Sequence, residues 1–326
     1  MLKKLKVDLF VFAIAISILL AYFFPQLGAT GSKIPLNLIS SLGVSLIFFF
    51  YGLSINYEAL KSGLKNWKLH LTVQSSTFLL FPVLILPFYP LFIGTENELL
   101  WLAFLFIAAL PSTVSSSVVM VSMAKGNISA AIFNASISGI LGIILTPLWM
   151  MPFILKTDVA FDFSTIYFKL FSEILLPLIL GLFLKRFFGV WAQRHKKLLS
   201  FFDKFVILLI IYKSFAQSFY DEIFSSVSLL EIIAIIGLVI LLFFSVYALT
   251  GWIGKLLNFN RADSITNQFC GTKKSLVHGT VFSKALFGQT SVIGIILLPL
   301  MLYHAIQILI ISVIAAKKGK EIKTDF

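Results

Sequence analysis

The sequence predicts an all-α polytopic membrane protein with ten transmembrane helices, built as two inverted five-helix repeats in which the fourth and ninth helices are broken and cross. Its composition is the first reason. Of the 326 residues 59% are hydrophobic and only 12% are charged, and the mean hydropathy is +1.00. A soluble protein of this length needs more charge to cover its surface, so the main solvent is expected to be lipid.

Hydrophobic runs of spanning length are the second reason. Each is long enough to cross a hydrocarbon core about 30 Å thick. The basic start before the first run resembles a signal peptide, but nine further runs follow, so we expect an uncleaved first helix. The ten runs cover residues 7–25, 35–53, 69–91, 99–123, 128–150, 166–184, 198–219, 229–253, 263–287 and 291–316.

The halves 1–160 and 161–326 repeat one another, which is the third reason. The sixth, eighth and tenth runs begin about 160 residues after the first, third and fifth. Five spans per repeat is an odd number, so the second copy must be inverted in the membrane. Polar breaks near residues 114 and 273 are separated by the same interval, and paired broken helices are typical of secondary transporters.

The basic residues predict the orientation. With ten spans both termini share one side, and most of the 26 lysines and arginines fall on that side. Lys284 is among the few assigned to the opposite side. By the positive-inside rule we expect both termini to be cytoplasmic, in the cytoplasmic (inner) membrane. The net charge of +12 is therefore interpreted as a topology signal, and no nucleic-acid partner is expected.

The break in the fourth run is rich in hydroxyl groups. Pro111 lacks a backbone donor, so freed carbonyls and hydroxyls there can coordinate a cation or bind a solute. The alternative is a proline kink whose serines bond their own helix or form a small-residue packing face. We expect Asn134 and Ser138 in the fifth run to share one face, and Gln74 is a weaker candidate for the same cavity. The hydroxyl candidates are Thr113, Ser115, Ser116 and Ser117.

The break in the ninth run contains two adjacent lysines, Lys273 and Lys274. An unpaired ammonium in hydrocarbon costs a few kcal/mol or more, so both need a function, unless the segment is a loop in water. Neighbouring residues point about 100° apart on a helix, so at most one lysine is expected to face a given site. The other candidates are Asn267, Gln268, Cys270, Thr272, Ser275 and His278, which shares a helical face with Lys274.

Two further polar residues lie in the apolar runs. Glu173 is a candidate proton carrier, but we favour a structural pair with Lys169 at helical spacing. His304 is interpreted as a hydrogen-bonded core residue. No metal-ligand pair, catalytic dyad or nucleotide motif stands out, so we expect no enzyme activity, no metal and no cofactor.

At this level of detail the chain resembles the bile acid:sodium symporter family. The resemblance rests on the ten spans, on the run from Pro111 to Ala124-Lys125-Gly126-Asn127, and on the stretch 270–279. The divergent bacterial SBF-like branch is the closer resemblance, because it shares the pattern Cys-Gly-x-Lys-Lys-Ser. It implies a core domain from helices three to five and eight to ten, a panel domain from helices one, two, six and seven, and substrate between them.

The resemblance also implies where sodium ligands would lie. In sodium-coupled members a carboxylate and a glutamine on the ninth helix help to bind two sodium ions, and those places hold Cys270 and Lys274 here. We therefore expect neither of the two sodium sites in this chain. Our hypothesis is that Lys273 or Lys274 replaces sodium and that the other attracts an anionic solute, with proton coupling as an alternative. Further family positions fall on Ser116, Ser117 or Val118, on Ala131 and Ala135, and on Gln74.

The expected function is secondary transport, of the symport type, by alternating access around the broken helices. The expected partners are the lipid bilayer and a small organic anion, either bile-acid-like or another amphipathic carboxylate. A membrane sensor or regulator that binds a ligand at the same crossover without moving it is the alternative from a different class. A channel is disfavoured because the breaks are paired in an inverted repeat.

Overall fold

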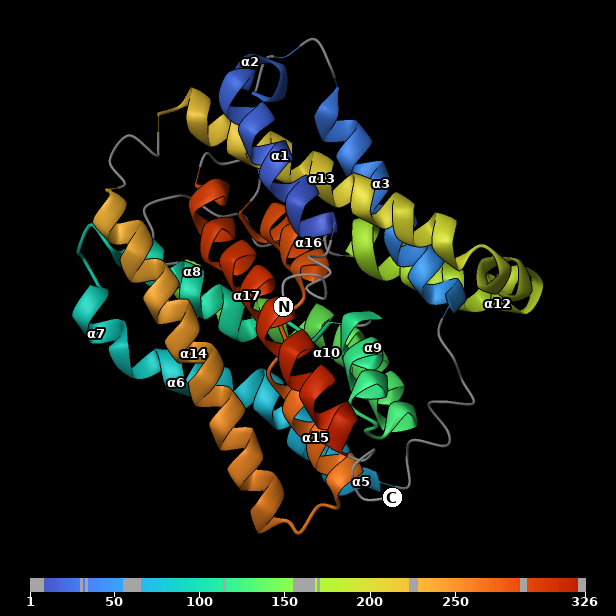
Figure 1. Cartoon of the computed structure of the whole chain (residues 1–326). Helices are drawn as coiled ribbons and strands as arrows, with labels where there is room; N and C mark the ends of the chain where they lie inside the picture. Colours follow the sequence, from blue (N-terminus) through green and yellow to red (C-terminus); the bar gives the residue numbers. More distant parts are fainter. Residues whose placement is uncertain are drawn as a thin grey trace. The chain divides into compact units, whose positions relative to one another are not determined.

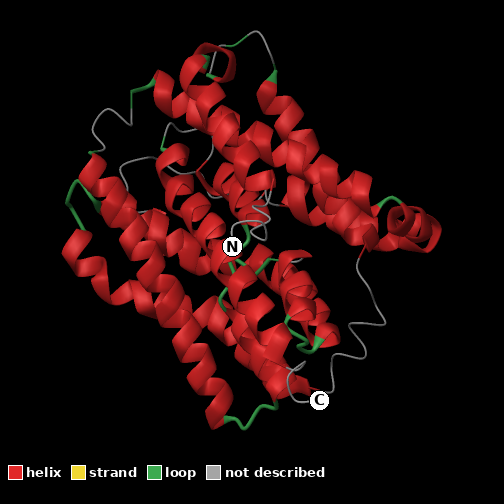
Figure 2. Ribbon diagram, in the orientation of Figure 1, coloured by secondary structure: helices red, strands yellow, loops and turns green. Residues whose placement is uncertain are grey.

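The computed structural model describes residues 9–29, 32, 35–54, 66–113, 115–154, 168, 171–222, 228–287 and 292–321. Within these ranges the regular structure is entirely helical, as Figures 1 and 2 show, and no strand occurs in them. The all-α prediction is confirmed for this part of the chain.

Several helices are long and apolar enough to cross a membrane. The chain is therefore a multi-pass membrane protein, as its composition predicts, while the number ten and the inverted repeat stay predictions. Two shorter apolar helices cover Phe12–Phe23 and Glu98–Ala109. The six long ones among the described residues are Leu36–Ser54, Trp67–Phe92, Ile128–Ile154, Phe171–Arg194, Leu229–Leu256 and Ile293–Lys320.

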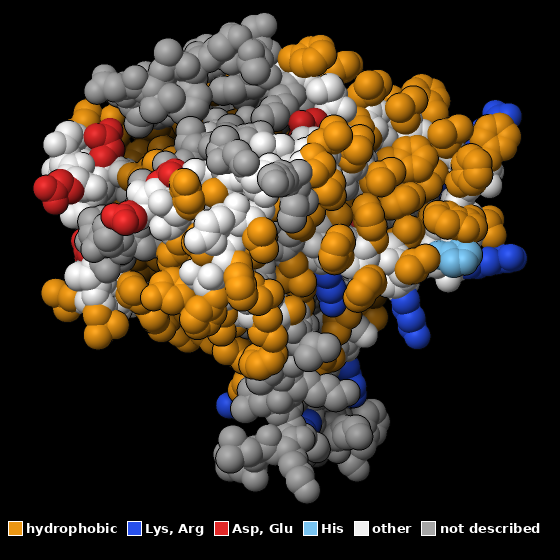
Figure 3. All heavy atoms as spheres, turned by 90° about the horizontal axis from the view of Figure 1, so that it is seen from above, with side chains coloured by type: hydrophobic (Ala, Val, Ile, Leu, Met, Phe, Trp, Pro, Cys, Tyr) orange, Lys and Arg blue, Asp and Glu red, His pale blue; other side chains and the backbone are white. Residues whose placement is uncertain are grey.

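Apolar side chains dominate the outer surface, which is the signature of contact with lipid. Figure 3 shows them over much of the visible face. Phe12, Phe183 and Leu230 are large apolar residues that are mostly exposed, at 61%, 73% and 77%. Exposed phenylalanine and leucine in such numbers would be unstable in water, whereas hydrocarbon solvates them at no cost.

The chain divides into two compact units. The first unit comprises Met1–Ile55, Ile154–Ser228 and Thr280–Leu297. In it α1 and α2 pack on α13, and α3 packs on α12 and on the π-helical turn η5. Its elements are α1 (Leu9–Phe23), α2 (Pro25–Gly28), α3 (Leu36–Ser54), η5 (Phe171–Leu175), α12 (Leu176–Arg194) and α13 (Lys196–Tyr220), together with parts of α16 (Leu276–Phe287) and α17 (Ile293–Glu321).

The second unit comprises Asn56–Phe153, Leu229–Gly279 and Leu298–Phe326. It contains both predicted breaks and the remaining parts of α16 and α17. Its other elements are α5 (Trp67–Ser75), η3 (Ser76–Leu80), α6 (Phe81–Ile85), η4 (Leu86–Phe88), α7 (Tyr89–Phe92), α8 (Glu98–Ala109), α9 (Ser115–Met123), α10 (Ile128–Ile154), α14 (Leu229–Leu256) and α15 (Arg261–Gly271).

The fourth and ninth predicted spans are each two shorter helices. In the fourth, α8 stops at Ala109 and α9 begins at Ser115, on either side of Pro111. In the ninth, α15 stops at Gly271 and α16 begins at Leu276, so Lys273 and Lys274 lie in non-helical chain. Interrupted helices leave backbone groups without intrahelical partners, and these groups decide the chemistry of the second unit.

Candidate functional site

The broken end of α8 presents its carbonyl oxygens to a lysine. A helix C-terminus has carbonyls with no intrahelical donor. Lys274 Nζ donates to the carbonyl oxygens of Ala108 at 2.7 Å and Leu110 at 2.8 Å. The hydroxyl of Thr146 donates to the carbonyl between them, that of Ala109, at 2.8 Å. The end of α8 is therefore capped by side chains from other parts of the second unit.

A third carbonyl reaches the same ammonium from the π-helical turn η3. There the N–H of Phe81 donates to the carbonyl of Ser76, one residue further back than in an α-helix. The next residue, Pro82, has no N–H to offer. The carbonyl of Thr77 thus loses both nearby intrahelical donors, and it accepts from Lys274 Nζ at 2.7 Å instead.

The Lys274 ammonium is bound much as a metal cation would be. Its three N–H groups meet three backbone carbonyl oxygens, so its donor capacity is used completely. It also lies 4.0 Å from the ring centroid of Phe81, which adds a cation–π contact. The side chain is fully buried, and among the described residues no carboxylate forms an ion pair with it. Among the described residues, backbone carbonyl dipoles and the Phe81 ring offset its charge.

Lys273 is buried to the same degree but is bound differently. Its Nζ donates to the carbonyl oxygen of Ser116 in α9 at 2.8 Å, which uses one of three N–H donors. The expectation that at most one lysine faces a given site stays a prediction. It assumed helical geometry, whereas residues 273–275 are non-helical and both side chains turn into the protein.

The lysine segment is held by backbone contacts to the other break and to α17. The N–H of Ser275 donates to the carbonyl of Pro111 at 2.9 Å. The Gln307 side chain accepts from the Lys274 N–H and donates to its carbonyl, both at 2.8 Å. The Tyr303 hydroxyl donates to the carbonyl of Thr272 at 2.7 Å. This non-helical segment inside the protein therefore has its backbone groups satisfied by a backbone carbonyl and by side chains.

The hydroxyls of the first break have mostly local partners. Thr113 and Ser117 share a hydrogen bond of 2.7 Å, and Ser116 donates to Thr113 at 2.9 Å. Ser112 has partners in other helices. Its hydroxyl donates to the carbonyl of Cys270 at 2.7 Å, and its N–H donates to the hydroxyl of Ser138 at 2.9 Å. Ser115 begins α9, and its side chain lies outside the described part of the structure.

Other predicted site residues make contacts away from the lysines. Gln74 Nε2 donates to Asn134 Oδ1 at 3.1 Å, which joins α5 to α10. Asn267 donates to the Thr250 carbonyl at 2.8 Å and Gln268 to the Tyr247 carbonyl at 3.2 Å. These last two bonds tie α15 to α14.

The remaining predicted site residues make local contacts within the second unit. His278 shares a hydrogen bond of 2.9 Å with Ser275, and the Thr272 hydroxyl donates to the carbonyl of Gln268 in α15.

Sequence reasoning missed Gln307, Tyr303, Thr146 and Phe81. A signal for two of them existed, because Tyr303 and Gln307 lie four residues apart in a strongly apolar helix and so share a face. The prediction for His304 agrees with its buried position and its contact of 3.1 Å with Gln307.

Comparison with known proteins gives the family. Residues 8–319 match the model of the SBF-like CPA transporter family. The putative symporter YfeH of Escherichia coli is 35% identical over 315 residues, which cover 96% of this chain and 93% of the relative. The sodium/bile acid cotransporter 7 of Xenopus tropicalis is 33% identical over 321 residues, at 96% and 92% coverage. An uncharacterized protein of Pseudomonas aeruginosa is 34% identical over 313 residues, at 96% and 93%. The chain belongs to the SBF-like CPA transporter family, whose members are membrane transporters and not enzymes.

Proposed function

We propose that the protein is a secondary transporter of a small amphipathic organic anion, and that the Lys274 ammonium takes the place of a coupling sodium ion. The anion class is suggested by the Xenopus relative, whose name includes bile acid. Sodium, which that name also includes, is not carried over, because a lysine occupies the position where a cation would bind.

One observation carries this proposal: the Lys274 ammonium is surrounded by three carbonyl oxygens at 2.7–2.8 Å. Two of these carbonyls come from the end of the interrupted helix α8 and the third from the π-helical turn η3. Backbone carbonyls freed in this way coordinate cations in transporters. A sodium ion in the same place would compete with the ammonium for the same oxygens. A sodium-coupled transporter binds a positive charge anew in each cycle. In this protein we assign that charge to a side chain that is covalently part of the chain.

The two lysines then have different roles. Lys274 uses all its donors on the protein, whereas Lys273 uses one and keeps two N–H groups for another acceptor. We assign Lys274 to the structural cation and Lys273 to attraction of the solute's anionic group.

The finer architecture is part of the same proposal. We propose ten transmembrane helices in two inverted repeats, with the core and panel domains that the family resemblance implies. We also propose an inner-membrane location with both termini in the cytoplasm. Support comes from the spacing of the two breaks and from the asymmetric basic residues.

Uptake of radiolabelled taurocholate into proteoliposomes tests the function. Taurocholate carries a permanently ionised sulfonate, so it crosses protein-free bilayers slowly. We expect wild-type uptake to be equal in sodium and in choline buffers, and Lys273→Ala to reduce it at least tenfold. Lys255→Ala, which removes an exposed lysine at the end of α14, is the matched control and should transport normally.

Binding of taurocholate without any flux would contradict the transporter and favour a sensor. Strictly sodium-dependent uptake by the wild type would contradict the assignment of Lys274. Normal uptake by Lys273→Ala would show that this lysine does not attract the solute.

A further inference from the structure

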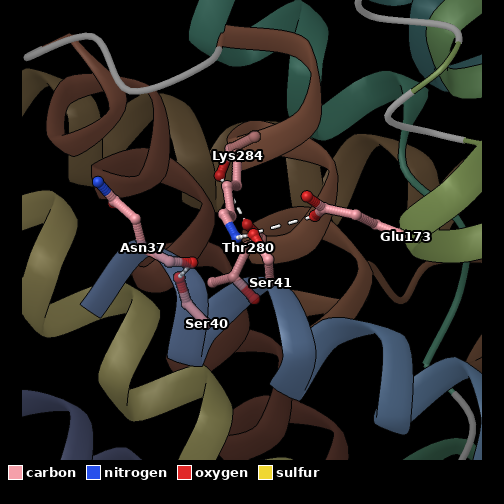
Figure 4. A network of polar contacts seen from close by, with 7 residues as sticks. Asn37, Ser40, Ser41, Glu173, Thr280 and Lys284 are labelled. Carbon is pink, nitrogen blue, oxygen red and sulfur yellow. Dashed lines mark hydrogen bonds and ion pairs between the residues drawn. The ribbon is translucent and has the colours of Figure 1, made fainter. Parts of the chain in front are cut away.

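Away from the two helix breaks, the first unit contains a pair of opposite charges, of which Lys284 is buried and Glu173 half-buried. Glu173 in η5 and Lys284 in α16 approach with Oε2 and Nζ 3.8 Å apart. Their side chains are only 18% and 6% exposed. Figure 4 shows Ser41 and Thr280 gathered with Glu173 around the lysine amine. The Lys284 Nζ also donates to the hydroxyl of Ser41 in α3.

This arrangement differs from what the sequence predicts. Lys284 was expected in a connection outside the membrane, but it is buried in the helical core of its unit because Glu173 and Ser41 supply partners there. Lys169, the expected partner of Glu173, lies outside the described residues. An ion pair inside a membrane protein is expensive to bury and is a functional-site hypothesis by default.

The elements packed against η5 bring few titratable groups near Glu173. The helices packed against η5 are α3 and α12. α3 carries no charged residue, and Tyr51 is its titratable side chain. The charged groups of α12 are Lys185, Arg186 and Arg194, more than two turns away along that helix. On α16, His278 bonds Ser275. Within the described residues, Lys284 is the charged group in contact with the Glu173 carboxylate.

Protonation of Glu173 alone, or binding of an anion at Lys284 alone, leaves a charge without compensation inside the protein. If Glu173 takes a proton, the Lys284 ammonium loses the anion that offsets it. If an organic anion approaches Lys284 while Glu173 is ionised, two negative groups share one cation. Both costs disappear when the proton and the anion arrive together.

We propose that Lys284 is a second anion-binding position and that protonation of Glu173 makes it available, so that one proton accompanies each organic anion. In this step a proton from water binds a carboxylate oxygen of Glu173, and the neutral acid releases the ammonium. The carboxylate or sulfonate of the solute then pairs with Lys284 and accepts from Ser41 as well. Loss of the proton on the other side reverses the exchange, and the net movement is electroneutral.

A further polar side chain lies near Ser41 on α3. Asn37 lies one turn before Ser41 on α3, and its Oδ1 is buried with no hydrogen-bond partner among the described residues. Such an acceptor costs free energy unless a donor reaches it in another state.

The inference rests on the proposed function, and equilibrium binding of tritiated taurocholate across a pH series tests it. The probe does not titrate in this range, so any pH dependence belongs to the protein. We expect wild-type affinity to rise about tenfold for each pH unit of acidification while Glu173 is ionised in the free protein, as one coupled proton requires. Glu173→Gln, which imitates the protonated acid, should bind with the high acid-side affinity at every pH.

Two further variants complete the test. Glu173→Gln combined with Lys284→Met leaves no unpaired charge, so it should fold, bind at least tenfold more weakly than Glu173→Gln, and show no pH dependence. Glu222→Gln removes an exposed carboxylate and should keep the wild-type pH response.

Each contrary outcome has a distinct meaning. If taurocholate is taken up and the Glu173→Gln variant keeps the wild-type pH dependence of binding, this inference is overturned and the proposed function is unaffected. Unchanged affinity in the double variant would exclude Lys284 as the binding position. Absence of both binding and uptake in the wild type would overturn the proposed function and this inference with it.

Discussion

At the scale of single residues, the two adjacent lysines differ in what their removal leaves behind. Each buried carbonyl that loses its donor costs about 1–3 kcal/mol. Lys274→Ala removes the ammonium donor from the carbonyls of Thr77, Ala108 and Leu110, whereas Lys273→Ala removes it from the carbonyl of Ser116, which lies inside helix α9. Lys274→Ala is therefore expected to be the more destabilising change, by several kcal/mol. The space and the oxygens that it leaves suit a sodium ion.

The sequence predicts the two buried lysines but not the groups that they contact. Lysine in an apolar run signals a buried, functional charge, and both lysines are buried as that signal implies. Their partners are backbone carbonyls, which every residue has, so no residue type marks them in advance. The free carbonyl of Thr77 depends on Pro82 and on a π-helical turn that hydrophobic periodicity does not reveal.

At the scale of elements, two helices of the first unit touch through glycine. A Cβ on Gly181 in α12 would overlap the carbonyl oxygen of Phe49, and a Cβ on Gly52 in α3 would overlap that of Leu178. Small residues let membrane helices approach until their backbones meet. Since α3 carries Ser41 and packs against η5, which carries Glu173, this contact also sets the position of the ion pair.

Gly181→Ala should therefore destabilise the protein by several kcal/mol, because the obstructing atom is backbone and cannot rotate away. The thermal melting temperature of the purified protein measures the effect. Gly237→Ala is the matched control, since a Cβ there meets nothing within 4 Å and alanine favours helix by about 1 kcal/mol. A Gly181→Ala protein as stable as Gly237→Ala would contradict the close contact.

The elements themselves were partly predictable. Pro111 and the polar stretch around Lys273 indicated where helices four and nine stop, because a missing donor and buried polar groups are both visible in sequence. Two partners from distant segments were not predictable. Gln307 lies 33 residues from the lysine whose backbone it binds, and Lys284 meets Glu173 across a still longer separation. Pairings of that kind depend on tertiary packing, which spacing within a helix does not encode.

At the scale of the whole molecule, the charge pattern predicts the orientation in the membrane. The helix α13 runs from Lys196 to Tyr220 and is flanked by basic residues at its start and by Asp221 and Glu222 at its end. Basic connections stay in the cytoplasm, so the start of α13 is expected inside and its end outside.

Cysteine labelling measures this orientation. Cys270 is the single cysteine and is buried, so the wild type serves as the unlabelled control. In intact spheroplasts a membrane-impermeant maleimide should label Glu222→Cys, and it should label Lys196→Cys only after permeabilisation. The reverse pattern would place both termini outside and contradict the positive-inside assignment.

The central claim is that a lysine ammonium replaces a sodium ion, and thermal stability in sodium compared with choline tests it most directly. A ligand that binds only the folded state raises the melting temperature by mass action. We expect no sodium effect on the wild type or on the control Lys255→Ala. We expect Lys274→Ala to melt lower in choline and to recover part of that loss in sodium. Sodium stabilisation of the wild type, or a Lys274→Ala protein indifferent to sodium, would contradict the claim.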